Sequence, residues 1–435
     1  HRTEYGGVRF APRSPKALAD IFDDFERIAS KAAVDFAGML VAEFVPGSDG
    51  IPRQLLVSLR QDPAFGPVVF CGLGGVGTEL YQRSLLPEKG LFMRPAALVR
   101  DRAATAKALG ETLFYPMVAG ETRGSAGALV EGEKLVASLE RFACIAERFS
   151  RRSTASPYTV EELEVNPLQI TEAGELVPLD ALMRVSTEKR LEANAPEELI
   201  RRLLRPESAL VVGASASKVN SGRIILRNLA SGGGVPRDRI YCLHPDAAEI
   251  DGCRAFRTSA DLPAPADMAI VAVPADRGAD RTVVELVEGR QARTVTLISG
   301  GFAETEGGRE AEARMKAAIE RGHQDPDGGV LVNGGNCLGI ISVPGGYNTF
   351  FLPPYKLPFN DAPGQNVASI SQSGAYLVCQ ISNLDRTVRP RYAISFGNQM
   401  DVTVSDYLAY LEGDPGARVF SVYLEGFQRG DGARF

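Results

Sequence analysis

The sequence predicts an α/β protein built from several domains, and three patterns support this. A hairpin-like stretch spans 163–180, strands alternate with helices over 208–340, and a further strand, small-residue turn and helix follow from 367. The chain has 435 residues, of which 44% are hydrophobic and 23% charged. That length and composition suit about two to four domains, each with its own core.

Composition narrows the functional classes. The formal net charge of −6 argues against a nucleic-acid scaffold. The six cysteines are scattered with no CxxC pair, which is typical of reduced thiols rather than of disulfides or a zinc site. The apolar runs are too short to cross a bilayer, and no signal peptide is visible. We therefore expect a cytoplasmic protein with no nucleic-acid and no membrane partner.

The first part of the chain mixes helices and strands. Gly6 and Gly7 lie between a polar turn and an apolar pair, which indicates a loop whose backbone can approach a ligand. The glycine-rich stretch 72–80 suits either a phosphate loop or a tight crossing of strands. Periodicity predicts helices over 14–33, Ala96–Leu109 and Glu131–Phe149, and strands over Gly38–Phe44, Gln54–Leu59 and Val68–Phe70.

The stretch Leu163–Asp180 carries the first candidate site. Two apolar runs flank turn-forming residues 172–174, a pattern typical of a tight hairpin. Glu164 and Asn166 are two residues apart and project from one face of a strand, with Asp180 opposite them at the far end of the second strand. Carboxylate and amide oxygens suit Mg²⁺, which proteins hold together with nucleotide phosphates. A surface hairpin with ordinary polar residues explains the spacing equally well.

A second pattern follows a charged linker at 187–206. Strands alternating with helices predict a doubly wound parallel sheet, in which the ligand lies beyond the carboxyl ends of the strands. The loops at those ends are 213–218, 273–276, 299–302 and 333–339. The expected strands are 209–213, 239–243, 268–273, 293–299 and 329–332, and the expected helices are 221–231, 280–288 and 309–321.

The loops of this sheet indicate the class of ligand. A nicotinamide site needs GxGxxG after the first strand and an acidic residue after the second, but the second strand here ends Leu243-His244-Pro245. The loops offer backbone N–H groups and small side chains, which suits a phosphorylated ligand such as coenzyme A. A Rossmann-like domain with unremarkable turns is the alternative.

The third pattern begins after a Pro-, Gly- and Tyr-rich stretch at 346–366, which we predict to be a crossover. The small-residue turn Ser371–Ala375 leads into a helix at 376–384 and places backbone amides at its N-terminus, a ready anion site. Plain serine capping is the alternative. The other expected elements are strands at 367–371, 391–396 and 418–424 and a helix at 404–412.

Short motifs follow one another in a consistent order along essentially the whole chain. They are HRTEYGGV at 1–8, the DPxFGPVV stretch in 62–75, Glu164 and Asn166 with Asp180, GAS at 213–215, VPA at 273–275, NCLGI at 336–340, SQSGA at 371–375, SFGNQMDV at 395–402 and YLEG at 423–426. Their order and wording resemble the NDP-forming acyl-CoA synthetases, the superfamily of succinyl-CoA synthetase and ADP-forming acetate–CoA ligase.

The resemblance implies an α/β fold class with a partial ATP-grasp domain at 1–186, a Rossmann-like CoA-binding domain at 207–345 and a truncated flavodoxin-like ligase subdomain at 367–435. It implies an ADP-forming acid–thiol ligase that makes acyl-CoA from a small-molecule carboxylic acid, ATP and CoA. An acyl phosphate forms, CoA displaces phosphate, and a histidine carries the phosphoryl group to the nucleotide site. The implied cofactors are Mg²⁺, ATP and coenzyme A, and the analogy extends to a homodimer.

The resemblance also implies residue roles. Asn166 and Asp180 match the Mg²⁺–nucleotide ligands, and Glu164 and Glu425 match two glutamates that orient the phosphohistidine. Ser373 and Gly374 match the helix start that holds its phosphoryl group. The implied cofactor-binding residues are Gly6, Gly7, Gly213, Ser215, His244, Pro245, Val273, Pro274, Ser299, Gly300, Gly301 and Asn336.

The sequence departs from the family pattern at several places. The shuttling histidine should follow the YLEG strand, and His1, His244 and His323 do not fit that role. The strand with the nucleotide-binding lysine, which should precede the first motif, is also missing. Gly335 stands where family members have proline before Asn336. We therefore expect a fragment of a longer fused synthetase that does not complete turnover.

Two other functions are left open by the sequence. One is a CoA- and nucleotide-binding regulatory module of an acyltransferase-type protein that lacks ligase turnover. The other is a nicotinamide-dependent oxidoreductase, against which the missing acidic residue after the second strand counts. The sequence does not identify the carboxylic acid or distinguish ATP from GTP.

Overall fold

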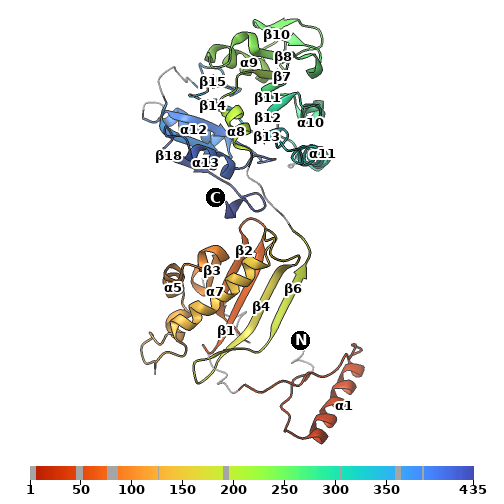
Figure 1. Ribbon diagram of the computed structural model, residues 1–435, viewed down its shortest axis with the longest axis vertical. Coiled ribbons are helices and arrows are strands. Elements are labelled where there is room, and N and C mark those ends of the chain that lie inside the picture. Colours follow the sequence, from red (N-terminus) through yellow and green to blue (C-terminus); the bar gives the residue numbers. More distant parts are fainter. Residues whose placement is uncertain are drawn as a thin grey trace.

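The computed structural model describes residues 6–45, 52–75, 87–125, 127–189, 195–302, 305–357, 364–384 and 387–435. Three β-sheets follow one another along the chain. The first sheet forms a lower lobe and the second and third sheets share an upper lobe, with the C-terminus between the lobes (Figure 1). No helix in the described residues is both long and apolar enough to cross a bilayer.

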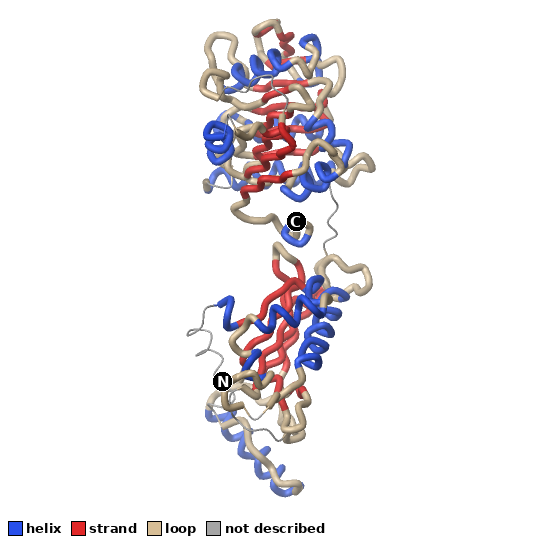
Figure 2. The backbone as a smooth tube through the Cα atoms, turned by 90° about the vertical axis from the view of Figure 1, so that its left-hand side faces the viewer, coloured by secondary structure: helices blue, strands red, loops and turns tan. Residues whose placement is uncertain are grey.

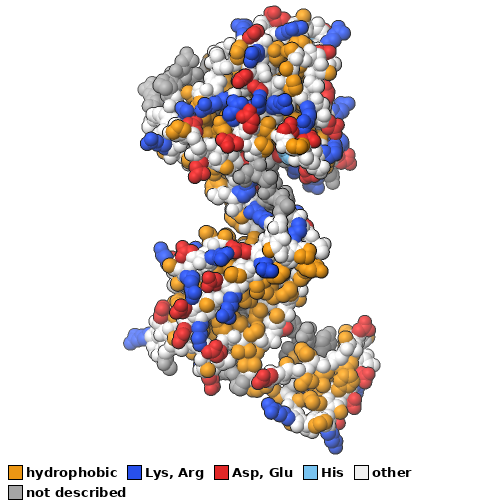
Figure 3. All heavy atoms as spheres, viewed as in Figure 1, with side chains coloured by type: hydrophobic (Ala, Val, Ile, Leu, Met, Phe, Trp, Pro, Cys, Tyr) orange, Lys and Arg blue, Asp and Glu red, His pale blue; other side chains and the backbone are white. Residues whose placement is uncertain are grey.

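The N-terminal segment consists of helix α1 (Pro15–Lys31) and extended chain on either side of it. Ser14 caps the helix, because its hydroxyl oxygen accepts a hydrogen bond from the Ala17 N–H. The expected strand at Gly38–Phe44 is wrong, since these residues form no strand and Leu40 is 89% exposed. A strand needs a neighbouring strand for its backbone hydrogen bonds, and the described residues offer this segment none. Figure 3 shows apolar side chains gathered over the N-terminal segment as a whole.

The first sheet is antiparallel, with strand order β3-β2-β1-β4-β5 and β6 also paired with β4. Helix α7 covers one face and buries Leu55, Val57 and Leu59 of β1 beneath it. The helix expected over Ala96–Leu109 is split, because Asp101 caps a new helix within it. The strands are β1 (Gln54–Asp62), β2 (Gly66–Leu73), β3 (Leu91–Pro95), β4 (Thr159–Ile170), β5 (Leu176–Pro178) and β6 (Ala181–Ser186), and the helices are α3 (Pro87–Gly90), α4 (Ala96–Val99), α5 (Arg102–Gly110), α6 (Tyr115–Val118) and α7 (Gly132–Arg148).

The second sheet has the order β13-β12-β11-β7-β8-β10-β9 and is parallel except for the β9–β10 pair. Its strands β7 and β11 are short, mostly apolar runs buried along their whole length, as expected for a doubly wound sheet. The strands are β7 (Ala209–Val212), β8 (Ile240–Leu243), β9 (Glu249–Ile250), β10 (Cys253–Phe256), β11 (Ala266–Val271), β12 (Ala292–Leu297) and β13 (Leu331–Gly334), and the helices are α8 (Glu197–Leu204), α9 (Ser221–Gly232), α10 (Ala279–Glu288) and α11 (Glu306–Gly322).

The third sheet has the order β15-β14-β17-β16-β18, with β16 parallel to both β17 and β18. Part of the stretch expected to be a crossover forms β15 of this sheet, paired antiparallel with β14. The strands are β14 (Ile340–Ser342), β15 (Tyr347–Asn348), β16 (Gln365–Ser371), β17 (Pro390–Ser395) and β18 (Val419–Tyr423), and the helices are α12 (Gly374–Leu384) and α13 (Val404–Glu412).

One continuous core joins the second and third sheets. Leu203 of α8, Ile270 of β11, Ile394 of β17 and Tyr407 of α13 belong to the same buried apolar cluster. Helices lie on both sides of the strands in this lobe (Figure 2). Because the two sheets share a core, the loops at their strand ends are held against each other, and these loops form the site described next.

Candidate functional site

A cavity of about 780 Å³ lies between loops of the second sheet and loops of the third. Its lining includes Ala272 and Ile298 from the second sheet and Gln372 from the third. Six of the residues predicted from the sequence line it together: Pro274, Ser299, Asn336, Ser373, Gly374 and Glu425. The structure thus brings three of the four predicted CoA loops, 273–276, 299–302 and 333–339, together with the predicted helix start.

The N-terminus of α12 opens into this cavity. The Ser373 hydroxyl accepts a hydrogen bond from the Tyr376 N–H at 3.2 Å, and Ser371 donates to the Ser373 carbonyl at 2.7 Å. A Cβ atom at Gly374 would lie only 3.0 Å from the Leu338 Cβ, so glycine lets the helix start pack against residue 338. The first amides of a helix point outward with partial positive charge, which makes this end of α12 suited to an anion.

Glu425 is positioned beside α12 by Gln372. The Gln372 side-chain oxygen accepts hydrogen bonds from the N–H groups of Glu425 at 2.9 Å and Gly426 at 3.4 Å. The Gln372 backbone N–H also donates to the Tyr423 carbonyl at 2.9 Å. The side chain of Gln399 reaches the Gly426 carbonyl at 2.8 Å from the other side. The backbone that carries the Glu425 carboxylate is therefore held at two successive residues.

The other predicted cofactor loops lie at the carboxyl ends of neighbouring parallel strands. Because Val212 pairs with Leu243, Gly213 and His244 follow at adjacent strand ends, with Pro245 next in the chain. The His244 Nδ1 accepts hydrogen bonds from the Asp246 and Ala247 N–H groups at 3.2 and 2.9 Å, so this ring nitrogen shapes the turn.

The two inner loops contact each other directly. The Ser299 hydroxyl donates to the Val273 carbonyl, and the Asn336 N–H donates to the Ser299 carbonyl at 2.8 Å. Gly300 lies against Asn336, since a Cβ there would come within 2.8 Å of the Asn336 side-chain oxygen. Gly301 follows with a φ of +93°, a conformation that glycine adopts without strain.

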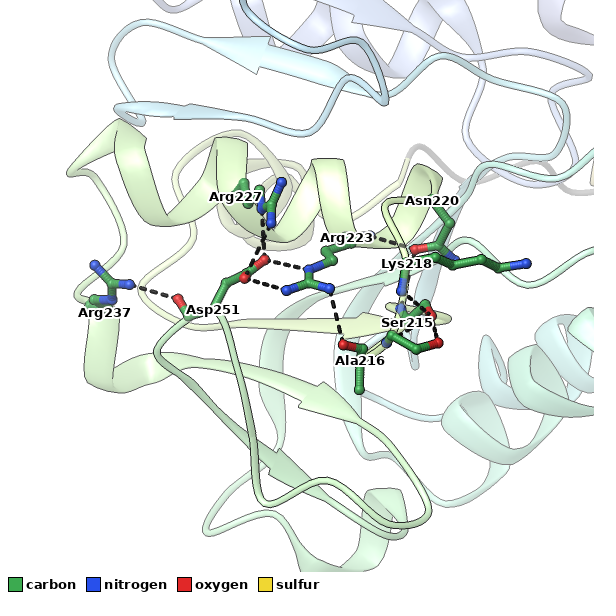
Figure 4. A network of polar contacts seen from close by, with 9 residues as sticks. Ser215, Ala216, Lys218, Asn220, Arg223, Arg227, Arg237 and Asp251 are labelled. Atoms are coloured by element: carbon green, nitrogen blue, oxygen red, sulfur yellow. Dashed lines mark hydrogen bonds and ion pairs between the residues drawn. The ribbon is translucent and has the colours of Figure 1, made fainter.

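The first loop is held by a network of polar contacts (Figure 4). The Asn220 side chain accepts from the N–H groups of Ser215 and Arg223 at 3.2 and 3.1 Å and donates to the Gly213 carbonyl at 2.7 Å. Arg223 reaches the Ala216 carbonyl at 3.1 Å. Asn220 thus caps α9 and closes the loop at the same time.

Arg223 is in turn held by a carboxylate. It pairs with both oxygens of Asp251 at 2.8 and 2.7 Å, and Arg227 pairs with the same group at 2.8 Å. The hydrogen bond from Arg223 is the main reason that the pKa of Asp251 lies far below its usual range. With two guanidinium groups on one carboxylate, the loop edge keeps a net positive charge, which suits a phosphorylated ligand.

Cys337 lies in the cavity wall but is not a nucleophile at neutral pH. Burial raises the pKa of its thiol to about 12. The thiol also donates to the Leu297 carbonyl at 3.3 Å. A thiol that stays protonated is a poor nucleophile, since the thiolate is the reactive form.

The predicted metal hairpin lies in the lower lobe, on the first sheet. Glu164 pairs with Leu182 and Val165 with Ala181, so Asn166 faces Asp180, and the Asn166 N–H donates to the Asp180 carbonyl at 3.1 Å. Side chains at directly opposed positions share a face of the sheet. Glu164 lies two residues before Asn166 on β4. The structure therefore brings the backbones of Asn166 and Asp180 together, with Glu164 close by in the same strand.

The local backbone explains how this arrangement is built. The second arm of the hairpin is interrupted at residues 179–180, between β5 and β6. On β4 the pair Asn166-Pro167 opposes the single residue Leu56, which is a β-bulge. Proline lacks the N–H that a regular ladder needs, so its place in a bulge is expected. Asp180 therefore lies at a break in the middle of the hairpin rather than at its far end.

The oxygen atoms at the bulge fit a hard cation. The Asn166 side-chain oxygen accepts from the Gly75 N–H at 2.9 Å and one Asp180 oxygen accepts from the Ala181 N–H at 2.9 Å. These bonds orient both groups and leave further lone pairs on each, the donor set that Mg²⁺ takes alongside phosphate oxygens. The described residues contain no cluster of three or more His, Cys, Asp or Glu side chains able to enclose a metal by themselves.

Among the described residues, Gly6, Gly7 and His323 are not part of either site. Gly6 and Gly7 are exposed in the N-terminal segment, and neither makes a hydrogen bond to the hairpin within the described chain. Residues 76–80 of the glycine-rich stretch and His1 lie outside the described residues. His323 is used elsewhere, since its ring nitrogens contact Asp401 at 2.8 Å and the Gly328 carbonyl at 2.6 Å.

Sequence reasoning missed several residues of these sites. Gln372 stood inside a recognised motif without a role, and Asn220 carried a signal of its own, as an asparagine directly before a helix. A row of paired charges on β1, β4 and β6 was also missed, in which Glu162 contacts Arg60 at 2.6 Å and Arg184 at 2.7 Å. This row lies one position along the same face from Glu164, and it carries more positive than negative charge.

Three protein-family models match the chain in order. An ATP-grasp domain matches residues 1–185, a CoA binding domain matches 207–342, and a succinyl-CoA ligase like flavodoxin domain matches 363–435.

Curated relatives point the same way. The chain is 27% identical over 99% of its length to "Acetate--CoA ligase [ADP-forming] II" of Archaeoglobus fulgidus, of which it covers 57%. It is 29% identical over 53% of its length to the alpha subunit of the ADP-forming acetate–CoA ligase II of Pyrococcus furiosus, of which it covers 46%. The chain thus spans about half the length of these relatives.

Solved structures include the apo form of the dinucleotide forming acetyl-coenzyme A synthetase 1 of Ca. Korarchaeum cryptofilum, with 31% identity, a TM-score of 0.47 and coverage of 54% of this chain and 48% of that one. A form of that protein with coenzyme A and Mg-AMPPCP matches at 24% identity and a TM-score of 0.31, over 43% of this chain and 71% of that one. The order of the three matched domains and the end-to-end similarity to an ADP-forming acetate–CoA ligase show that this chain belongs to the NDP-forming acyl-CoA synthetase family.

Proposed function

We propose that this chain is part of an ADP-forming acid–thiol ligase, which makes acyl-CoA from a carboxylic acid, ATP and CoA by way of an acyl phosphate and a phosphohistidine. The observation that carries the proposal is the cavity, where the N-terminus of α12, Glu425 and the CoA-domain loops meet. An anion site and a cofactor entrance in one cavity are the parts that exchange between phosphate and thiol requires, and the carboxylate beside them supports a place for the phosphohistidine.

The residues take the following roles in this proposal. Ser373 and Gly374 at the start of α12 hold the phosphoryl group of the acyl phosphate. The loops 213–215, 244–245, 273–274, 299–301 and 336 hold CoA and aim its thiol into the cavity. The thiolate sulfur attacks the carbonyl carbon, the bond from that carbon to the phosphate oxygen breaks, and phosphate leaves with the electron pair. Glu425 orients the phosphohistidine at this cavity and Glu164 orients it at the nucleotide site.

The hairpin supplies the nucleotide half of the proposal. Asn166 and Asp180 hold Mg²⁺, which neutralises charge on the phosphates of ATP when it is bound. Arg60 and Arg184 add positive charge on the same face, which supports a place for phosphates there. Gly6 and Gly7 are proposed to approach the nucleotide through their backbone. The proposed enzyme is a cytoplasmic homodimer that uses small molecules and neither nucleic acid nor a membrane, and the net charge of −6 is in line with this.

Exchange between acyl phosphate and CoA tests the proposal without the phosphohistidine. The chain is mixed with isobutyryl phosphate and CoA, and isobutyryl-CoA is measured by chromatography. We expect the thioester to form. Glu425→Gln should keep this exchange, and so should the matched variant Glu412→Gln, at an exposed position on α13 away from the cavity. A Gly374→Leu change, which would collide with Leu338 at the helix start, should abolish it.

The exchange assay and a measurement of melting temperature together distinguish the ligase from the two alternative functions. CoA binding without any thioester would contradict the ligase and favour a regulatory module. A melting temperature raised by NAD⁺ and not by CoA would favour an oxidoreductase, because a ligand that binds only the folded state stabilises it.

A further inference from the structure

Part of the cavity lining is apolar. Leu338, Phe351, Leu352 and Val378 form this part, and we name these four residues the apolar wall. Leu338 is 5% exposed, while the other three are half-buried and packed against the same small core. Of the polar lining residues of the cavity, Ser299 and Glu425 come from other loops, whereas Asn336 precedes Leu338 on the loop 333–339.

The helix α12 relates the apolar wall to the proposed phosphate position. Val378 lies four residues after Gly374, and residues at this spacing sit one above the other on the same face of a helix. Leu338 packs directly on the helix start, as shown by the 3.0 Å approach to Gly374. The apolar wall therefore adjoins the first turns of α12, next to the proposed phosphate position.

The backbone of the wall is held by a buried side chain. The Asn228 amide, on α9 and 4% exposed, donates to the carbonyls of Phe350 at 2.7 Å and Leu352 at 3.0 Å. This fixes the chain on both sides of Phe351. The wall is thus preorganised, and the carbonyls beside it already accept hydrogen bonds.

We propose that the apolar wall selects the carboxylic acid, favouring acids with a branched or aromatic apolar body over acetate and over acids with a hydroxyl at the tail. This inference rests on the proposed ligase function and names its substrate class. The single methyl group of acetate makes no contact with the wall in this proposal. In a larger acid, each further carbon that is buried against the wall adds favourable transfer free energy. A tail hydroxyl loses its water at the wall and finds no side-chain partner on it.

Arsenolysis of acyl-CoA thioesters tests selection in the chain as it stands. An arsenate oxygen attacks the thioester carbon, the carbon–sulfur bond breaks, CoA leaves and takes a proton from water, and the acyl arsenate hydrolyses to the free acid. Released CoA is measured by chromatography with acetyl-CoA, isobutyryl-CoA, phenylacetyl-CoA and 4-hydroxybutyryl-CoA. We expect kcat/KM for the isobutyryl and phenylacetyl thioesters to exceed that for the other two by about tenfold or more.

Variants locate the selection at the wall. Val378→Ser should lower kcat/KM for isobutyryl-CoA by about tenfold while acetyl-CoA changes little, and Phe351→Leu should affect phenylacetyl-CoA most. Val419→Ser, an exposed valine of β18, should leave all four values unchanged. CoA binding, measured calorimetrically, confirms that each variant is folded.

The outcomes separate this inference from the proposed function. Cleavage of acetyl-CoA as fast as the larger thioesters, or equal effects of Val378→Ser on all of them, overturns selection by the wall and leaves the ligase function standing. Cleavage of none of the thioesters overturns the ligase function, and the inference with it.

Discussion

Gln372 lies between the two groups that the proposed reaction needs most, the N-terminus of α12 and Glu425. Its side-chain oxygen accepts from two successive backbone N–H groups, at Glu425 and Gly426. Such a pair of bonds fixes the direction of a loop without touching the reacting atoms. We therefore regard Gln372 as a positioning residue.

Replacing Gln372 with leucine should leave the Glu425 loop free to move. We expect the rate of acyl exchange between phosphate and CoA, at saturating substrates, to fall about tenfold or more, because the displaced backbone lines the cavity next to Ser373 and small misplacements near reacting groups are costly. The KM for CoA should change little. Gln380→Leu is the matched control, since Gln380 also joins α12 to β18, through Ser421 at 2.9 Å, but lies away from the cavity. Equal losses in both variants would contradict the positioning role.

His323 offers a pH-dependent contact between the second and third sheets. Both of its ring nitrogens face acceptors, the Asp401 carboxylate and the Gly328 carbonyl, so the bound ring is the charged form. The hydrogen bond to Asp401 raises the pKa of His323 to about 9. Since the folded pKa lies above the ordinary value, the contact stabilises the fold fully at acidic pH and is lost as the pH rises through about 9.

The His323→Gln variant measures this contribution. We expect the wild type to exceed the variant in free energy of unfolding by about 1–2 kcal/mol near pH 6, a value reduced for partial solvent exposure. The difference should shrink toward zero above pH 9. Urea titrations across this range provide the measurement, and a difference that grows with pH would refute the assignment.

At the scale of the element, helix α9 begins with a residue that serves two purposes. Asn220 caps the helix and closes the loop 213–218 over which CoA is proposed to lie. Asn220→Ala should therefore lower the free energy of unfolding by about 1 kcal/mol and also weaken CoA binding several-fold. Asp101→Ala removes a similar cap from α5 in the lower lobe and should cost similar stability without altering CoA binding. Titration calorimetry and urea unfolding distinguish the two effects.

The hairpin of β4 with β5 and β6 yields a prediction about the metal. Asp180→Asn removes the only carboxylate at the break in the second arm, at residues 179–180, and should weaken binding of Mg²⁺·ADP about tenfold. The rise in melting temperature that Mg²⁺·ADP produces should largely disappear. Glu172→Gln, at the exposed turn of the same hairpin, should keep the full rise. An undiminished rise in Asp180→Asn would remove this residue from the proposed metal site.

Across the whole molecule, the segment after β18 connects the two lobes. The Gly430 N–H donates to the Pro63 carbonyl at 2.7 Å, and the rings of Phe427 and Phe65 meet edge to face at 5.4 Å. Asp431, 2% exposed, anchors this segment to α13 through Thr403 at 2.7 Å. The turn between β1 and β2 thus rests on the end of the chain that carries Glu425.

Phe65→Ala should loosen this contact between the lobes. An edge-to-face aromatic pair contributes about 0.5–1.5 kcal/mol beyond its buried area, so the two lobes should separate part of the time. We expect a larger radius of gyration in X-ray scattering and faster proteolysis between the lobes. Phe10→Ala, which removes a similar ring pair with Phe44 in the N-terminal segment, should leave proteolysis between the lobes unchanged. Identical scattering from Phe65→Ala and the wild type would count against the contact.

Much of the fold followed from local patterns, and particular failures show the limits. Alternating apolar runs located β7, β11 and β12 to within about two residues, because buried strands carry a strong signal. Short strands such as β9 and β15 were missed, since two residues carry almost no periodicity. The strand expected at Gly38–Phe44 is wrong for another reason. A residue pattern indicates which side chains could share a face of a strand, but it does not show whether a neighbouring strand is there to pair with it.

The sequence by itself determined the order of the three α/β units, the family, and the hairpin that carries Glu164, Asn166 and Asp180. These depend on neighbours in the chain and on the two-residue repeat of a strand, which sequence displays directly. Only the tertiary structure decided that Gln372 holds Glu425, that Asn228 shapes the apolar wall, and that the CoA loops and α12 enclose one cavity. These contacts join residues more than 50 positions apart, and packing of the two sheets on a common core selects them.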